Sequence, residues 1–363
     1  MSWSWTLYRY LALQFLVGVA IWYGGFLLLA FSIDVVDLLN RTAGHNVNAG
    51  VVIGMAILQL PDLGQKMMPF AVLLGGVFAF VRLARNHELV ATRAAGVSAW
   101  DFLAPPLAVA VGLGVLAVVA LTPLSASMLA QFSALEAKYI RGEASQLAVS
   151  QNGFWLRQGD ENGQSMVHAL RVADQGQRLE DVSVWLFGNH DDFRGRIEAQ
   201  SAELGKGAWT LNNAWVSGSE GTPVHHPTYA LPTALTPAQI QESFAPPDTL
   251  SFWDLPRFID AAQQAGFSAI RYQLYLYTLL ALPALFAAMV FMAASFSLQI
   301  GRSGGLVRVI VISALSGFGV YFFSDLTRAL GQSGILPVML AASAPAAAAI
   351  LIGMTLVFHQ EDG

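Results

Sequence analysis

The sequence predicts an α-helical membrane protein with six transmembrane helices, three on each side of an inserted all-β, jelly-roll-like domain. Three observations support this fold class. Of the 363 residues, 55% are hydrophobic and only 12% are charged, whereas an ordinary soluble domain carries about 25% charged residues. Six apolar stretches are long enough to cross a bilayer as helices. Between the third and the fourth, the apolar residues change to the alternating period of β-strands.

The sequence contains no cysteine, which excludes disulfides, thiolate metal sites and a cysteine nucleophile. The net charge of −5 is unevenly distributed. Residues 125–260 carry 9 Lys and Arg against 16 Asp and Glu, and the rest of the chain carries 10 against 8. The inserted part is therefore acidic and the membrane part slightly basic, which argues against a nucleic-acid partner.

The first span covers about Tyr10 to Ile33. It is longer than the apolar core of a secretory signal, and no Ala-x-Ala cleavage site follows it, so we expect a retained helix. Aromatic residues at its start are typical of a membrane–water interface: Trp3, Trp5, Tyr8 and Tyr10.

The second span is predicted as one long helix, about Val51 to Ala84, kinked at Pro61 and Pro69. Its first part, up to Leu60, is too short to cross the membrane alone, so we expect these turns to project beyond the bilayer. The third span follows from about 102 to 121.

A polar stretch, Arg82 to Ser98, separates the second and third spans. It is too polar to be buried in the membrane, yet its apolar residues fall near helical spacing. Gly96 follows the last of them, as glycine often does just past a helix end. We therefore predict a short helix at a membrane surface within residues 86–98.

The character of the chain changes at Pro123. Residues 125–142 still have a helical pattern, and from about 148 to 245 the period becomes two. Clusters of Gly, Asp and Asn interrupt this alternation and predict turns between short strands. A jelly-roll-like domain of about 100 residues is expected. Four tryptophans of this region are expected mostly in its core: Trp155, Trp185, Trp209 and Trp215.

A short amphipathic helix up to Gln264 follows the β region, and three further spans are predicted at about 272–298, 307–326 and 335–358. The expected domains are residues 1–124 with spans one to three, 125–265 with the β-domain and its flanking helical segments, and 266–363 with spans four to six.

Orientation follows from the positive charge of short loops. A cytoplasmic N-terminus places six basic residues on the inside: Arg9, Arg82, Arg85, Arg93, Arg302 and Arg308. The outer loops and span ends then hold three: Arg41, Lys66 and Arg328. Both termini are therefore expected in the cytoplasm. The β-domain is expected outside, which is the periplasm for a bacterial inner membrane.

Catalytic motifs are absent from the sequence. No Gly-x-x-x-x-Gly-Lys-Ser/Thr loop is present, so the chain has no such site for nucleotide hydrolysis. His87-Glu88 resembles the start of a zinc-protease motif, but position 91 is Ala, so the second ligand is missing. We expect no bound metal or cofactor and no enzymatic activity. Intramembrane charges are almost absent, which argues against an ion-coupled carrier. At the outer end of span five, Asp325 and Arg328 are one turn apart and are expected to pair.

Glu88 lies on the predicted surface helix, close to Arg85 and Arg93. It has two interpretations. It is either one charge on a solvated helix face or the acidic contact to a separate nucleotide-binding subunit that drives this chain. In the second case, a charged contact would be strongly sensitive to mutation.

Four basic residues near the outer ends of the spans also have two interpretations. They are either ordinary anchors whose ammonium and guanidinium groups reach the headgroups, or a basic rim that binds lipid phosphates. These residues are Lys66, Lys138, Arg141 and Arg41.

The β-domain has three interpretations. It is a rigid cap, a container whose apolar interior carries an acyl chain, or a sheet whose edge accepts a strand from another protein.

Several motifs resemble the lipopolysaccharide-export permeases of the LptF/LptG family. They are Leu60-Pro61, Met68-Pro69, residues 71–75 and above all the stretch from Arg82 to Ser98. Residues 37–39 and the Leu-Ala-Arg-Asn form of the last motif resemble the LptG branch more than the LptF branch. The order of three spans, β insert and three spans also agrees, so the resemblance covers essentially the whole chain.

The resemblance implies a Gram-negative inner-membrane permease that pairs with an LptF-like sibling. It further implies a dimeric, LptB-like cytoplasmic ATPase that uses the ATP and a single-span, LptC-like partner. Lipopolysaccharide would be taken from the outer leaflet and passed to a periplasmic jelly-roll bridge. The alternative is a non-transporting scaffold whose β-domain recruits envelope proteins.

Residue roles also follow from the resemblance. Glu88, with Arg85 and Arg93 beside it, would contact the ATPase. Lys66, Lys138 and Arg141, joined by Arg41, would contact phosphates of lipopolysaccharide.

Overall fold

The structure, a computed structural model, describes most of the chain. The described residues are 5–43, 47–94, 96–136, 139–140, 147–150, 153–160, 163–173, 177–188, 192–205, 207–218, 221–233, 246–264, 268–298 and 305–361. They form two compact units, Met1–Ile140 with Gln273–Gly363, and Arg141–Tyr272. The first is helical and the second contains the sheet.

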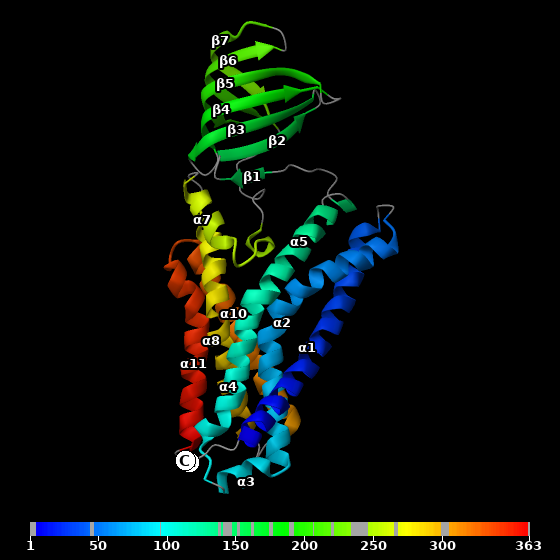
Figure 1. The fold of residues 1–363 in the computed structure, drawn as a ribbon, viewed down its shortest axis with the longest axis vertical. Helices are drawn as coiled ribbons and strands as arrows, with labels where there is room; N and C mark the ends of the chain where they lie inside the picture. Colours follow the sequence, from blue (N-terminus) through cyan, green and yellow to red (C-terminus); the bar gives the residue numbers. More distant parts are fainter. Residues whose placement is uncertain are drawn as a thin grey trace. The chain divides into compact units, whose positions relative to one another are not determined.

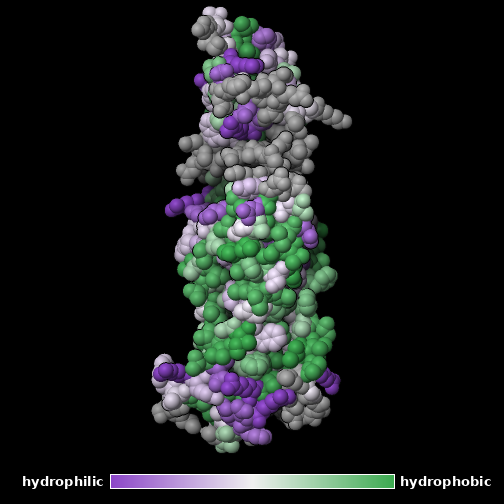
Figure 2. All heavy atoms as spheres, turned by 90° about the vertical axis from the view of Figure 1, so that its right-hand side faces the viewer, coloured by the Kyte–Doolittle hydropathy of each residue, from purple (hydrophilic) through white to green (hydrophobic). Residues whose placement is uncertain are grey.

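Six helices among the described residues are long and apolar enough to cross a membrane, which confirms the predicted fold class (Figure 1). They are α1 (Trp5–Thr42), α2 (Ala49–Arg85), α4 (Ala99–Leu116) continued by η1 (Ala117–Leu121) and α5 (Thr122–Glu136), α8 (Ile270–Leu298), α10 (Leu306–Gln332) and α11 (Val338–Glu361). The short helix α3 (Glu88–Ala94) joins α2 to α4. Hydrophobic side chains form a broad band on the helical unit, and hydrophilic ones gather below it, at the end where α3 lies (Figure 2).

The third span does not end at Pro123 but continues through it. Proline has no N–H to donate to the carbonyl four residues earlier. The helix widens immediately before it into the π-helical segment η1, where the N–H of Thr122 donates to the carbonyl of Ala117. The Thr122 hydroxyl also donates to this carbonyl, and it accepts from Gln65 on α2 at 3.1 Å. A local π-turn therefore lets one helix run from residue 99 to 136.

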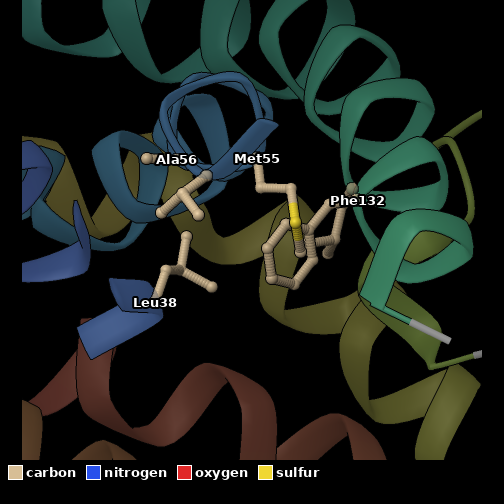
Figure 3. Close-up of a cluster of buried hydrophobic side chains, with 6 residues drawn as sticks. Leu38, Met55, Ala56 and Phe132 are labelled. Atoms are coloured by element: carbon tan, nitrogen blue, oxygen red, sulfur yellow. The ribbon is translucent and has the colours of Figure 1, made fainter. Parts of the chain in front are cut away.

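Helices α1 and α2 contain 38 and 37 residues, which makes each about 55 Å long, whereas a hydrocarbon core is about 30 Å thick. Each helix is therefore longer than a hydrocarbon core requires, and a projection of the first turns of α2 stays a prediction. Together with α5 they enclose a separate hydrophobic cluster (Figure 3). Its buried members are Leu38, Val52, Met55, Ala56, Leu129 and Phe132.

Helix α2 is the centre of the helical unit. In the apolar 18-residue stretch of α2, 67% is buried, against 17% in that of α1 and 17% in that of α10. Helices α1 and α2 meet at glycines: a Cβ added to Gly75 would lie 2.5 Å from the Cα of Val19, and one added to Gly18 would lie 2.5 Å from the carbonyl oxygen of Gly75. The two backbones are thus in direct contact, which is how small residues strengthen helix packing in membranes.

The second unit contains one seven-stranded antiparallel sheet, in which the described strands follow each other in chain order. They are β1 (Leu147–Ser150), β2 (Gly153–Asp160), β3 (Gly163–Ala173), β4 (Arg178–Phe187), β5 (Phe193–Leu204), β6 (Ala208–Gly218) and β7 (Val224–Pro232). Two helical segments follow, η4 (Pro247–Thr249) and α7 (Leu255–Gln264).

The sheet curls around an apolar interior. Leu156, Val167, Val184 and Ile197 stand opposite one another on four successive strands and are at most 2% exposed. Residues near the two opposite edges of the sheet also meet. The Thr233 hydroxyl, just after β7, donates to the side-chain oxygen of Gln158 on β2 at 2.7 Å.

A bend crosses the sheet. Asp181 on β4 and Asn213 on β6 have positive φ angles of 54° and 57°, and at both residues the alternation of buried side chains slips by one position. The alternation of buried side chains on β5 also shifts by one position where β5 passes these two residues. The register between the three strands is therefore the same on both sides of the bend. Asp and Asn tolerate this backbone conformation better than most residues. The slip keeps apolar side chains on the concave face.

The tryptophans do not share one environment, so the expectation that they mostly form the core is wrong in part. Trp209 is 1% exposed and lies in the interior, while Trp215 is 51% exposed. Trp155 and Trp185 stack on each other on the opposite face, with ring centroids 5.5 Å apart. Alternation predicts that two faces exist but does not say which face is covered.

We predict that Gly75→Ala destabilises the helical unit, because the new methyl group requires α1 to move away from α2. Overpacking of this kind costs about 1–3 kcal/mol, measurable as a lower free energy of unfolding in detergent. Gly24→Ala is the matched control, since nothing lies within 4 Å of a Cβ at that position. Equal stability of the two variants would contradict the backbone contact.

Candidate functional site

The polar stretch between α2 and α4 forms a helix bounded by two unusual backbone conformations. Helix α2 ends at Arg85, and His87 then has a positive φ of 59°. Helix α3 runs from Glu88 to Ala94, and Gly96 has a φ of 83°. A helix is therefore present in the predicted stretch, but it is shorter than 86–98. Left-handed residues at both ends interrupt the helical hydrogen bonding.

Glu88 is held by two neutral donors. The Tyr10 hydroxyl, from the first turns of α1, donates to Oε2 of Glu88 at 2.9 Å. The side-chain amide of Asn86 donates to Oε1 at 3.3 Å. No salt bridge of Glu88 occurs within the described part of the chain, and its side chain is partly exposed. The carboxylate is thus oriented, and no described cation pairs with it.

Of the two predicted neighbours of Glu88, Arg85 has a described side chain. Arg85 is exposed at the end of α2. Arg93 lies on α3, but its side chain is outside the described residues. Sequence reasoning missed Tyr10 and Asn86 as contacts of Glu88, since Tyr10 was assigned only to an interfacial aromatic belt. No local pattern indicates a contact between residues that far apart in the chain.

A cavity lies next to α3, between the cytoplasm-facing ends predicted for α2, α4 and α8. Its lining is mostly apolar: Phe80, Ala84, Thr92, Val97, Ser98, Ala99, Phe102, Leu103, Ala294 and Ser297. Helix α3 therefore borders open space as well as packed side chains.

The described basic residues at the other end of the spans are balanced by acids. Lys66 Nζ lies 2.7 Å from Oδ2 of the buried Asp62. Arg41 forms an ion pair with Asp37 at 2.8 Å and approaches Glu136, at the end of α5, at 3.8 Å. Lys138 and Arg141 lie outside the described residues. A phosphate-binding rim remains a prediction for all four.

Two further acids stand in this region of the spans. Asp34 is 9% exposed, and its Oδ2 has no hydrogen-bond partner among the described residues. Asp325 lies 3.9 Å from Arg328, which confirms the predicted pair on span five.

A family model described as lipopolysaccharide export system permease LptF/LptG matches residues 9–358. The chain belongs to the LptF/LptG family. The match includes all six spans and the inserted sheet.

Individual relatives agree with the family assignment. The lipopolysaccharide export system permease protein LptG of Escherichia coli K12 is 26% identical over 352 residues, which cover 92% of this chain and 93% of that protein. The protein of the same name from Haemophilus influenzae is 25% identical and covers 84% of this chain and 85% of its own length. The chain is therefore a permease of the lipopolysaccharide export system and a multi-pass inner-membrane protein, as LptF/LptG members are.

We predict that Gly96→Ala loosens the junction between α3 and α4. An L-residue with a Cβ at this φ costs about 1–2 kcal/mol, while the added methyl group itself has nothing within 4 Å. The expected result is faster amide hydrogen exchange in residues 88–98. Gly112→Ala, also without neighbours within 4 Å but inside α4, should leave exchange there unchanged. Similar exchange in both variants would show that the positive φ is not required.

Proposed function

We propose that this chain is the transmembrane subunit of an ATP-driven exporter that extracts lipopolysaccharide from the outer leaflet of the inner membrane. In this proposal, the lipid passes to a periplasmic bridge of jelly-roll domains. The chain itself is not an enzyme. The observation that carries the proposal is Glu88 on the helix between spans two and three, a carboxylate oriented by Tyr10 and Asn86 that forms no ion pair among the described side chains.

The energy must come from another subunit, since the sequence has no phosphate-binding loop for nucleotide hydrolysis. Positive charge in the short loops supports a cytoplasmic position for α3 and for both termini, and a periplasmic position for the sheet. A short helix with an unbalanced carboxylate suits a basic groove on a cytoplasmic ATPase. Arg85 and Arg93 then contact either that subunit or the membrane surface.

The size of the substrate explains why ATP is needed. Each CH₂ group removed from hydrocarbon into water costs about 0.8 kcal/mol, so one chain of a dozen carbons costs roughly 10 kcal/mol. A lipid with several chains leaves the membrane only if an apolar cavity replaces the bilayer and work is supplied. The largely exposed apolar surfaces of α1 and α10 suit a second permease as the other wall of such a cavity. An LptF-like sibling and an LptC-like single-span protein are the partners that this arrangement requires.

The phosphate groups of the lipid are assigned to the basic rim. Lys66 keeps a side chain that is 58% exposed while its ammonium contacts Asp62, so it can donate to a phosphate at the same time. Lys138 and Arg141 follow the end of α5, where Arg41 also lies near Glu136.

We predict that Glu88→Ala weakens binding of the ATPase by roughly 30-fold or more, as loss of a buried charged contact at an interface does. Copurification of the ATPase and ATP-dependent release of lipopolysaccharide from vesicles measure the two consequences. Glu203→Ala, which removes an exposed carboxylate of β5, is the control. Intact ATPase association and lipid release in Glu88→Ala would refute the coupling role and favour the scaffold alternative.

Lys138→Glu combined with Arg141→Glu is expected to reduce photocrosslinking of lipopolysaccharide to the complex by about a hundredfold, since each charge-assisted contact contributes about 1.5–3 kcal/mol. Lys66→Glu should act in the same direction. Arg178→Glu, an exposed position on β4, matches the charge change of the single variant Lys66→Glu. Unchanged crosslinking in the double variant would rule out the basic rim.

A further inference from the structure

The hydrogen bond between Tyr10 and Glu88 joins residues 78 positions apart in the chain. Tyr10 is 39% exposed, so its hydroxyl does not need an internal acceptor in the way that a buried one does. The bond links α1 to α3 directly, and it ends on the carboxylate to which the coupling role is assigned.

Helix α3 is a short element of seven residues. It follows a turn with positive φ at His87 and precedes another at Gly96, and a cavity borders it. Two side-chain hydrogen bonds end on its first residue, Glu88. Asn86 supplies one from the adjoining turn, and Tyr10 supplies one from a different membrane span.

Helix α1 is attached to the rest of the unit mainly along one side. Only 17% of its apolar 18-residue stretch is buried. Near its predicted cytoplasmic end it contacts α2 through Phe15 and Phe80, whose ring centroids are 6.4 Å apart, and through the backbone of Gly18. Tyr10 lies eight residues before Gly18, about 12 Å along the helix. Tyr10 therefore lies on the N-terminal part of α1, beyond the point where α1 comes closest to α2. A displacement of α3 would pull on this part of α1 through the hydrogen bond.

We propose that Tyr10 is a positioning residue that fixes the Glu88 carboxylate and transmits movements of α3 to α1. The inference rests on the proposed function and deepens it. A carboxylate has about four acceptor sites, so a cation of the ATPase can bind Glu88 while Tyr10 remains bonded. The first span then follows the coupling helix during each cycle of ATP hydrolysis.

The test uses the complete exporter, with ATPase and sibling permease, in vesicles that contain lipopolysaccharide. Tyr10→Phe removes one hydroxyl and keeps the ring. We expect the ATPase to remain bound and active, while lipid released per ATP hydrolysed falls by about three- to tenfold, the effect of one lost hydrogen bond. Tyr277→Phe, on α8 and 37% exposed, is the matched control and should release as much lipid per ATP as the unsubstituted chain.

A distance measurement separates transmission from general damage. The chain has no cysteine, so Trp5→Cys and Ala91→Cys place spin labels only at the exposed start of α1 and on the exposed side of α3. With Tyr10 present, the distance between the labels should stay constant between nucleotide-free and nucleotide-trapped states. With Tyr10→Phe it should change between them.

The possible failures are distinguishable. If the unsubstituted complex releases no lipid on addition of ATP, the proposed function is wrong. If that complex releases lipid, and Tyr10→Phe gives the same release per ATP and the same label distances, the transmission by Tyr10 is wrong while the proposed function stands.

Discussion

The backbone contact between Gly18 and Gly75 is the constraint on which the helical unit depends. A membrane offers little hydrophobic gain for bringing two apolar helices together, so close packing has to supply the attraction. The absence of side chains at these two positions lets α1 and α2 touch along their backbones. This contact places α1 against the central helix while leaving most of its apolar surface exposed.

The same principle recurs elsewhere in the unit. A Cβ on Gly114 of α4 would lie 2.5 Å from the Cα of Pro283 on α8, and one on Gly353 of α11 would lie 2.7 Å from the Cβ of Phe291. Small residues thus bring α4 and α11 onto α8, as Gly75 brings α1 onto α2. The bundle is built from two tightly packed central helices with more exposed helices beside them.

The two ends of the spans differ in how their charged side chains are paired. At the end predicted to be periplasmic, Lys66 and Arg41 are each paired with an acid. On α3, the described partners of the Glu88 carboxylate are neutral groups, Tyr10 and Asn86. An ion pair within the chain weakens the attraction to an outside partner, whereas an oriented and unbalanced charge favours it. Glu88 is therefore the stronger candidate for a protein contact, whereas lipid phosphates at the proposed basic rim would have to compete with Asp62 and Asp37.

The sequence by itself determined the six spans, the position of the β insert, the short helix between spans two and three and the family. These features depend on local properties, namely the length of apolar runs, their period and the motif that ends at Ser98. The tertiary structure decided which residues far apart in the chain meet. The contact of Gly18 with Gly75, the bond from Tyr10 to Glu88, the pairing of Gln158 with Thr233 and the burial of Trp209 but not Trp215 leave no periodic trace in the sequence. Each is set by how complete helices and strands pack, because a side chain's neighbours across an interface are determined by the geometry of both elements together.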